Sequence, residues 1–179
     1  MSAGATQAPG LLFDMNKLFE AHVAKREEDT TGPDQVVQQQ GPPLYLAARG
    51  ATGVFLLKPD ITVWNVDQNG AASGIDRVVD AKWKRLNPAA PDFGVDEADV
   101  YQLLTYATRY GCTKLELAYP MPDDMDAQLP APVFRILAEE DAHNQAIVVS
   151  VKLIPVWTRE MPNSSIQAPQ LTEAESVPA

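Results

Sequence analysis

Apolar side chains recur at helical spacing in two parts of the chain. Residues 11–29 predict a first helix, and residues 96–111 predict a second. The apolar positions of the first are Leu11, Leu12, Met15, Leu18 and Phe19, and its polar face holds Asn16, Lys17 and Glu20. The apolar stripe of the second is Val100, Leu103, Leu104 and Ala107, and its polar face holds Asp99, Gln102, Tyr106 and Arg109.

Elsewhere the pattern changes to β-branched and aromatic residues bounded by turn residues, which is typical of strands. Three strands are predicted before the second helix, from YLAARG (45–50), GVFLLKPDITVWNV (53–66) and RVVDAKWKRL (77–86). The turn residues of 67–74 predict that the last two of these form a hairpin. TKLELAYP (113–120) predicts a strand after the second helix, and residues 133–140 and 144–157 predict an added hairpin.

The predicted order is helix, three strands, helix, strand and hairpin, which indicates an α/β fold. Residues 30–43 are bounded by turn residues and are interpreted as a loop. Residues 1–10 are small and rich in Pro and Gly, so they are expected to be disordered, and residues 161–179 are expected to form a polar tail. One domain over residues 11–160 remains, and the chain of 179 residues is long enough to bury a real core.

Charge limits the classes of partner. The formal net charge is −10, which argues against a protein that holds nucleic acid by bulk electrostatics. Binding to nucleic acid would need a local basic patch, a bridging metal or a partner that supplies the grip. The chain has one cysteine, Cys112, and two histidines, His22 and His143, so neither a disulfide framework nor a structural zinc site is expected. With no signal peptide and no apolar run long enough to cross a bilayer, the cytoplasm is the expected compartment.

The strand RVVDAKWK has one apolar face and one charged face. Val79, Ala81 and Trp83 alternate with Asp80, Lys82 and Lys84. Folding the chain back about Gly70 and Ala71 places Asp60 opposite residues 80–82, so two carboxylates and a lysine converge on one face of the sheet. A cation would relieve the repulsion of the two carboxylates. The alternative is a surface salt bridge of Lys82 with Asp60 or Asp80, which would contribute little.

Mg²⁺ suits such a pair, because it prefers oxygen ligands, keeps several waters and binds phosphate oxygens. It also lowers the pKa of a bound water. A neighbouring lysine orients or deprotonates that water and offsets developing negative charge. The pattern therefore indicates a site that hydrolyses a phosphodiester, with Mn²⁺ as an alternative metal.

Three features in order, Pro59-Asp60, Asp80-Ala81-Lys82 and Gln102 on the following helix, resemble the PD-(D/E)xK nuclease superfamily. The longer segments LLFDMNKLFE, LKPDITVW, VVDAKWKRL and EADVYQLLTYATRYG resemble the nuclease domain of McrC proteins. These are the cleavage subunits of McrBC modification-dependent restriction systems. The resemblance covers roughly residues 11–120 and implies a metal-dependent DNA endonuclease with a restriction-endonuclease-like core.

The resemblance also implies roles for individual residues. Asp60, Asp80 and the Ala81 carbonyl would ligate Mg²⁺, Lys82 would serve the water, and Glu20 stands where related nucleases place another acid. Gln102 and Tyr106 match a Q-x-x-x-Y pattern of RecB-like relatives, and their spacing puts both on one helix face, at the site or against DNA. Three of these positions have ordinary alternatives: Glu20 as a solvated residue pairing with Lys17 or Asn16, and Gln102 and Tyr106 as a half-buried contact between helix and sheet. Lys84 is expected to meet a phosphate or solvent.

Partners follow from the same resemblance. The expected partners are double-stranded DNA, a McrB-like AAA+ GTPase motor and, transiently, a second nuclease domain. No association with a membrane is expected. The chain lacks a G-x-x-x-x-G-K-[ST] loop and is not expected to bind GTP itself. It begins almost at the nuclease-like region, which leaves coupling to a motor open. Two other readings stay open: a stand-alone RecB-like exonuclease or repair nuclease, and a catalytically inactive docking module for an AAA+ motor.

Overall fold

The computed structural model describes residues 13–122, 130–136 and 146–156. His143 lies outside these ranges. So do residues 1–10, which were expected to be disordered, and residues 161–179, which were expected to form a polar tail. The described elements are α1 (Met15–Thr30), β1 (Gln35–Gln39), β2 (Leu44–Arg49), β3 (Thr52–Leu57), β4 (Ile61–Val66), β5 (Ala72–Ala81), α2 (Glu97–Tyr110), β6 (Lys114–Pro120), β7 (Val133–Arg135) and β8 (Val148–Ile154).

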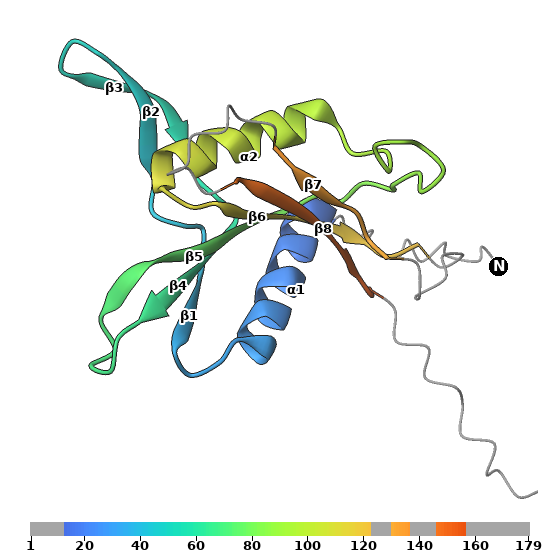
Figure 1. Ribbon diagram of the computed structural model, residues 1–179, viewed down its shortest axis with the longest axis horizontal. Helices are drawn as coiled ribbons and strands as arrows, with labels where there is room; N and C mark the ends of the chain where they lie inside the picture. The colour runs from blue at the N-terminus through green and yellow to red at the C-terminus, as the bar shows by residue number, and fades with distance from the viewer. Residues whose placement is uncertain (1–12, 123–129, 137–145, 157–179) are drawn as a thin grey trace, which may run out of the picture.

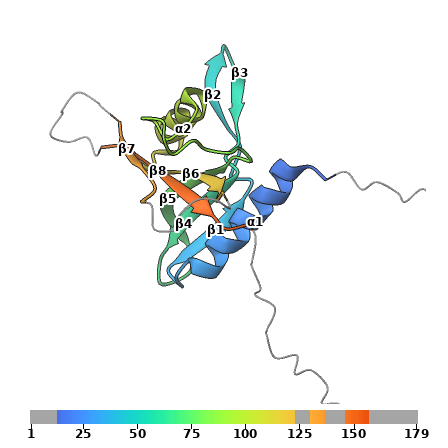
Figure 2. The same ribbon diagram turned by 90° about the vertical axis from the view of Figure 1, so that its right-hand side faces the viewer.

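A mixed sheet in the order β1-β4-β5-β6-β8-β7 forms the centre of the fold. The pairs β1–β4, β4–β5 and β7–β8 are antiparallel, while β5–β6 and β6–β8 are parallel. Helices α1 and α2 lie on opposite faces of this sheet, and the β2–β3 hairpin projects beyond α2 (Figures 1 and 2). The α/β fold class and the added C-terminal hairpin are thus confirmed over the described residues.

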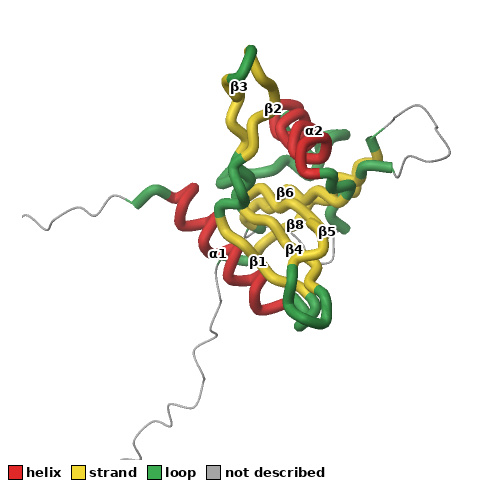
Figure 3. The backbone as a smooth tube through the Cα atoms, turned by 90° about the vertical axis from the view of Figure 1, so that its left-hand side faces the viewer, coloured by secondary structure: helices red, strands yellow, loops and turns green. Residues whose placement is uncertain are grey.

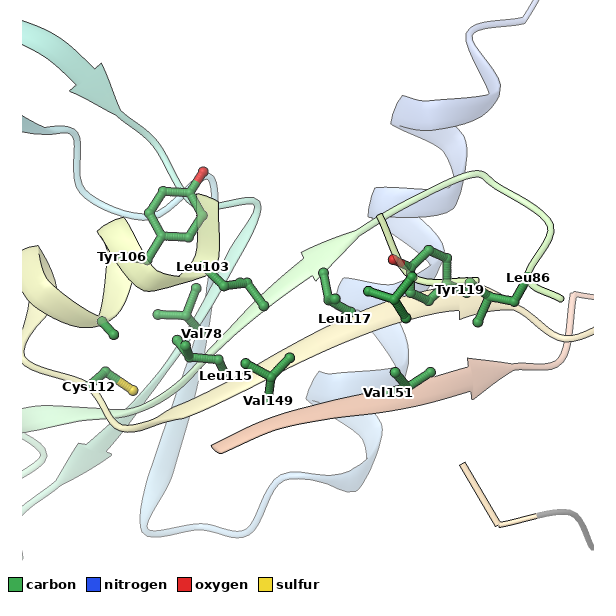
Figure 4. Packing of buried hydrophobic residues seen from close by; sticks show 12 residues of the cluster. Val78, Leu86, Leu103, Tyr106, Cys112, Leu115, Leu117, Tyr119, Val149 and Val151 are labelled. Carbon is green, nitrogen blue, oxygen red and sulfur yellow. The ribbon is translucent and has the colours of Figure 1, made fainter. Parts of the chain in front are cut away.

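Each face of the sheet buries its own apolar cluster. Under α2, Leu103 and Tyr106 lie over Val78 and Leu115, as Figure 4 shows. Under α1, Phe19 and Val23 pack on the opposite face of the sheet. Because successive side chains of a strand point to opposite faces, β5 contributes Val78 and Asp80 on the α2 side and Val79 on the α1 side.

Both helices begin at an aspartate cap. Asp14 accepts hydrogen bonds from the backbone N–H groups of Asn16 and Lys17, and Asp96 accepts one from Ala98. Helix α2 ends at Gly111, whose φ of 66° is the left-handed conformation that favours glycine. The start of α2 therefore has a fixed orientation, which matters because its first two turns supply side chains to the site.

The structure corrects three expectations. Residues 30–43 were expected to be a loop but contain β1, an edge strand whose QVVQQ pattern lacks alternation and which gains its hydrogen bonds from β4. Five strands rather than three precede α2: β1 is one addition, and the other arises because the chain turns at residues 58–60, where the N–H groups of Gln40 and Gly41 donate to the carbonyls of Asp60 and Pro59. This turn divides the predicted strand 53–66 between two sheets.

The third correction concerns the apolar face of α1. Met15 and Leu18 were placed on its buried stripe, but they are 37% and 53% exposed. The buried positions are Phe19, Val23, Ala24 and Glu27. Glu27 faces the sheet because Arg77 and Lys152 neutralise its charge there, a long-range effect that periodicity does not reveal.

Candidate active site

The start of β4 and the end of β5 bring two carboxylates together. Ile61 pairs with Val79, so Asp60 comes opposite Asp80, one position further along the hairpin. Oδ2 of Asp60 accepts a hydrogen bond of 2.9 Å from the backbone N–H of Ala81. The predicted convergence of Asp60 with residues 80–82 is therefore confirmed as geometry.

Lys82 lies beside these carboxylates. Its Nζ forms an ion pair of 2.7 Å with Oδ2 of Asp80 and donates a hydrogen bond of 2.9 Å to Oε1 of Gln102. Asp80 is 1% exposed, and apart from the ion pair its Oδ2 has no hydrogen-bond partner among the described residues. A buried carboxylate oxygen whose partner is a single ammonium has lone pairs left over that a further donor or a cation could use.

Helix α2 contributes Gln102 and Tyr106 to the same side of the sheet. Nε2 of Gln102 donates to the hydroxyl of Tyr106 at 2.8 Å, and that hydroxyl donates to the carbonyl of Lys58 at 3.4 Å. Tyr106 is buried and Gln102 half-buried, so both join the helix to the site rather than to solvent. Gln102 contacts Lys82 directly, whereas Tyr106 acts through Gln102 and the backbone.

Asp99 is a site residue that the sequence analysis placed only on the polar face of the helix. It is 6% exposed, and its Oδ1 lies 3.5 Å from Nζ of Lys82. Its Oδ2 accepts a hydrogen bond of 2.9 Å from Lys84 and one of 3.3 Å from the hydroxyl of Tyr119. The spacing of three residues from Gln102 is the sequence signal that could have placed it here.

Lys84 lies at the outer edge of this cluster. Its side chain is 48% exposed and pairs with Asp99 and, at 3.5 Å, with Asp96. The structure thus places Lys84 next to the site, with its ammonium reaching both solvent and the first turn of α2.

Glu20 approaches from the other helix. It accepts a hydrogen bond from Nε2 of Gln40, whose backbone N–H donates to the carbonyl of Asp60 at 2.6 Å. Gln40 has a φ of 52°, an uncommon left-handed conformation for a side chain of its size. No sequence signal marked Gln40, which connects Glu20 to the segment that carries Asp60.

The charges of the site act on one another. Burial, then the negative charge of Asp80, raises the pKa of Asp60 to about 7, and the charge of Glu20 adds to this. Burial also raises the pKa of Asp80, although Lys82 opposes the shift. Burial by itself would lower the pKa of Lys82, but the charges of Asp80, Asp99 and Asp60 raise it, so the ammonium stays protonated at neutral pH.

The remaining residues of interest lie outside the site. Trp83 packs against Phe19 with ring centroids 5.5 Å apart, and Trp64 donates to the hydroxyl of Thr62 at 2.9 Å. Cys112 is buried in the α2-side core. His22 contacts the carbonyl of Pro155 at 3.1 Å. These contacts give the two tryptophans and Cys112 packing roles in the part of the chain that the structure describes.

The family described as McrBC 5-methylcytosine restriction system component matches residues 1–120. The chain belongs to this family. The resemblance to McrC proteins, stated from the motifs, is thereby confirmed at the level of the McrBC family. No curated protein sequence matches the chain.

One similar solved structure is a half-complex from a tetradecameric assembly of Thermococcus gammatolerans McrB AAA+ hexamers with bound McrC. The likeness has a TM-score of 0.52 and 18% sequence identity, and it covers 79% of this chain and 29% of that chain. This McrBC-family chain therefore shares a fold with part of that much longer chain. Among the residues that the structure describes, no helix is long and apolar enough to cross a membrane.

Whether the site suits a metal ion depends on its donors. Within the described ranges, no three His, Cys, Asp or Glu side chains gather closely enough to hold an ion by themselves. Mg²⁺, however, is usually held by one or two carboxylates together with waters and substrate phosphates. Asp60 and Asp80 supply such a pair of carboxylates, and the otherwise unpartnered Oδ2 of Asp80 fits a cation that accompanies substrate.

Proposed function

We propose that this McrBC-family chain is the DNA-cleaving domain of a restriction system, an Mg²⁺-dependent endonuclease with a PD-(D/E)xK site. The observation that carries the proposal is the cluster of Asp60, Asp80 and Lys82 at the adjoining ends of two paired strands. A surface salt bridge does not account for it, because Asp80 is buried and the negative charges exceed the positive ones around Lys82.

The residues of the site have different proposed roles. Asp60, Asp80 and the carbonyl of Ala81 would hold Mg²⁺, with Glu20 close by to hold a bound water. When bound, the metal would polarise the phosphate and lower the pKa of a coordinated water. Because Lys82 stays protonated, it orients the water and offsets charge that develops on the phosphate rather than removing a proton. Gln102 fixes the ammonium of Lys82 by accepting its hydrogen bond.

The acidic chain suggests how DNA reaches the site. With a net charge of −10, unaided binding to a polyanion is expected to be weak and sensitive to salt. A McrB-like AAA+ motor that delivers duplex DNA would remove this difficulty, and the solved structure with a similar fold includes McrB hexamers. Cutting both strands needs two such sites or two successive nicks. Two nuclease domains would therefore pair transiently on the DNA.

A cleavage assay on two DNA forms tests this function. The purified chain is incubated with covalently closed circular DNA and with linear DNA, in Mg²⁺, in Mn²⁺ and in EDTA, with and without an AAA+ GTPase partner. An endonuclease converts closed circles to nicked and linear forms only when metal is present. Degradation of linear DNA alone would indicate an exonuclease instead. Absence of cleavage in every condition, together with tight binding of the motor, would identify a docking module.

A further inference from the structure

The β2–β3 hairpin is a two-stranded ribbon that stands apart from the central sheet (Figure 3). Its base is tied to the end of α2: Nε of Arg109 donates to the carbonyl of Tyr45 at 2.7 Å, and the hydroxyl of Tyr110 contacts the carbonyls of Pro42 and Leu57 at 2.7 and 3.1 Å. Beyond this base, every residue of β2 after Leu44 is exposed, and in β3 Thr52, Phe55 and Leu56 are exposed. The hairpin is therefore an arm held firmly at its root and open to solvent along its length.

The charge of the arm is opposite to that of the chain. Asp and Glu number 24 in the whole sequence, yet none occurs from Gln35 to Pro59. Arg49 near the tip, Lys58 at the root and Arg109 beside the root are exposed cations. A local basic surface is what a protein of net charge −10 needs if it is to approach a polyanion.

Large apolar side chains are exposed on the same arm. Phe55 is 71% exposed, Leu56 57% and Tyr45 50%. Phe55 has a φ of 58°, which is a strained conformation for an aromatic residue. The ring of Tyr45 lies so close to Gly53 that a Cβ at that position would collide with it. Exposed apolar side chains of this kind occur on proteins that insert side chains into a groove of duplex DNA.

The arm is also next to the candidate active site. Strand β3 ends at Leu57, and the chain reaches Asp60 after Lys58 and Pro59. The carbonyl of Lys58 accepts the hydrogen bond of Tyr106, which belongs to the site. A six-residue ribbon spans about 20 Å, and a two-stranded β-ribbon fits the major groove of B-DNA. A duplex with its backbone at Asp60 would run alongside this ribbon.

We propose that the β2–β3 hairpin is a DNA-binding arm that holds duplex DNA beside the site, with its cations on phosphates and Phe55 and Tyr45 toward the groove. This inference rests on the proposed nuclease function and adds the surface that positions its substrate. The charge of the arm favours duplex DNA over a protein partner. The arm carries Arg49 and no acidic side chain, so a polyanion is attracted to it more than to the rest of the acidic chain. A protein surface that covers the apolar residues is the other occupant that the test distinguishes.

Binding of a short fluorescent duplex tests the arm directly. The assay uses the full chain at low salt in Ca²⁺, so that binding is measured without relying on cleavage. The variants are Arg49→Glu and Phe55→Ser, with Arg26→Glu and Phe13→Ser as matched controls, because both control residues are exposed on or beside α1. Each arm variant is expected to weaken binding about tenfold, and Arg49→Ala is expected to reduce the salt slope by about one.

Unchanged affinity in both arm variants, or no duplex binding by the wild type at low salt, would overturn the proposal. Loss of binding to an AAA+ partner with DNA affinity intact would do the same and would make the arm a protein-docking element. Failure of the nuclease function is a separate result. A wild type that binds duplex DNA through the arm but never cleaves it refutes the nuclease proposal and leaves the arm supported.

Discussion

Oδ2 of Asp60 accepts a hydrogen bond of 2.9 Å from the backbone N–H of Ala81, which joins the start of β4 to the end of β5. This contact holds the Asp60 carboxylate near Asp80 although both are acids. It lowers the pKa of Asp60, but burial and the charge of Asp80 outweigh it and bring that pKa to about 7. The folded protein therefore binds a proton at Asp60 that the unfolded chain releases at a lower pH.

The sign of this shift predicts how stability changes with pH. Because the folded pKa of Asp60 lies above the ordinary carboxyl value, the metal-free protein loses stability as pH rises from about 4 to about 7. Asp60→Asn removes that loss, so at pH 8 in EDTA the variant is expected to melt at a higher temperature than the wild type. Mg²⁺ is expected to raise the melting temperature of the wild type and to leave that of the variant nearly unchanged.

Thermal unfolding at pH 5 and pH 8, with EDTA or Mg²⁺, measures both effects. Glu28→Gln is the control, because Glu28 is exposed and forms a surface pair of 3.6 Å with Lys25. If Asp60→Asn and Glu28→Gln respond alike to pH and to Mg²⁺, Asp60 is not a metal ligand.

Asp99 holds both lysines of the site and is expected to position Lys82. Asp99→Asn keeps the size and an acceptor for Tyr119 but removes the charge that faces Lys82 and Lys84. We expect the single-turnover cleavage rate to fall about 10- to 100-fold, less than the loss of a positioned acid–base group itself, because Asp99 acts through Lys82. Asp99→Asn in a Lys82→Ala background is expected to lower the cleavage rate little below that of Lys82→Ala alone, because the two residues act as a unit.

Additive losses in that double-mutant comparison would show that Asp99 acts independently of Lys82. NMR of isotope-labelled lysine side chains gives a second readout, which does not depend on catalysis. The Lys82 and Lys84 signals are expected to shift in Asp99→Asn, while that of Lys25 is not.

A buried ion-pair network holds α1 to the sheet. Glu27 contacts Arg77 at 2.6 Å and Lys152 at 3.0 Å, and Lys152 also contacts Glu116 at 2.6 Å. Burial alone would raise the pKa of Glu27, but hydrogen bonds from Arg77 and Lys152 lower it, so its stabilising effect is present at neutral pH and lost as pH falls below the ordinary carboxyl range.

Glu27→Ala is expected to destabilise the fold by up to about 3–5 kcal/mol, because it removes the buried carboxylate that Arg77 and Lys152 share. Urea denaturation at pH 7 measures this, again with Glu28→Gln as the control. Cleavage per folded molecule is expected to be unchanged. A stability loss no larger than that of Glu28→Gln would show that the network contributes little.

The core of the site was predictable because strand and helix periods are regular. A hairpin about Gly70 sets Asp60 against Asp80, and a spacing of four residues aligns Gln102 with Tyr106. The arrangement of the first helix on the sheet was not predictable in the same way. Its buried positions include Glu27, whose partners Arg77 and Lys152 are distant in sequence.

The other differences depend on how segments pair and pack in the folded chain. Strand β1 has no alternating pattern, so only its pairing with β4 makes it a strand. The break at Pro59 separates β3 from β4, although both are rich in β-branched and aromatic residues. Asp99 looked like a solvated helix residue, because its neutralisation by Lys82 and Lys84 depends on how α2 docks. These are features of tertiary contact, which a pattern along one segment does not contain.

The central claim is that Asp60, Asp80 and Lys82 form a metal-dependent phosphodiesterase site. The most direct measurement is the rate of Mg²⁺-dependent cleavage of closed circular DNA by the wild type, Lys82→Ala and Asp60→Ala, with an AAA+ partner present and Lys25→Ala as the surface control. Cleavage by the wild type and the control, with a loss of about 100-fold or more in both site variants, is the predicted result. Equal rates in all four proteins would contradict the site.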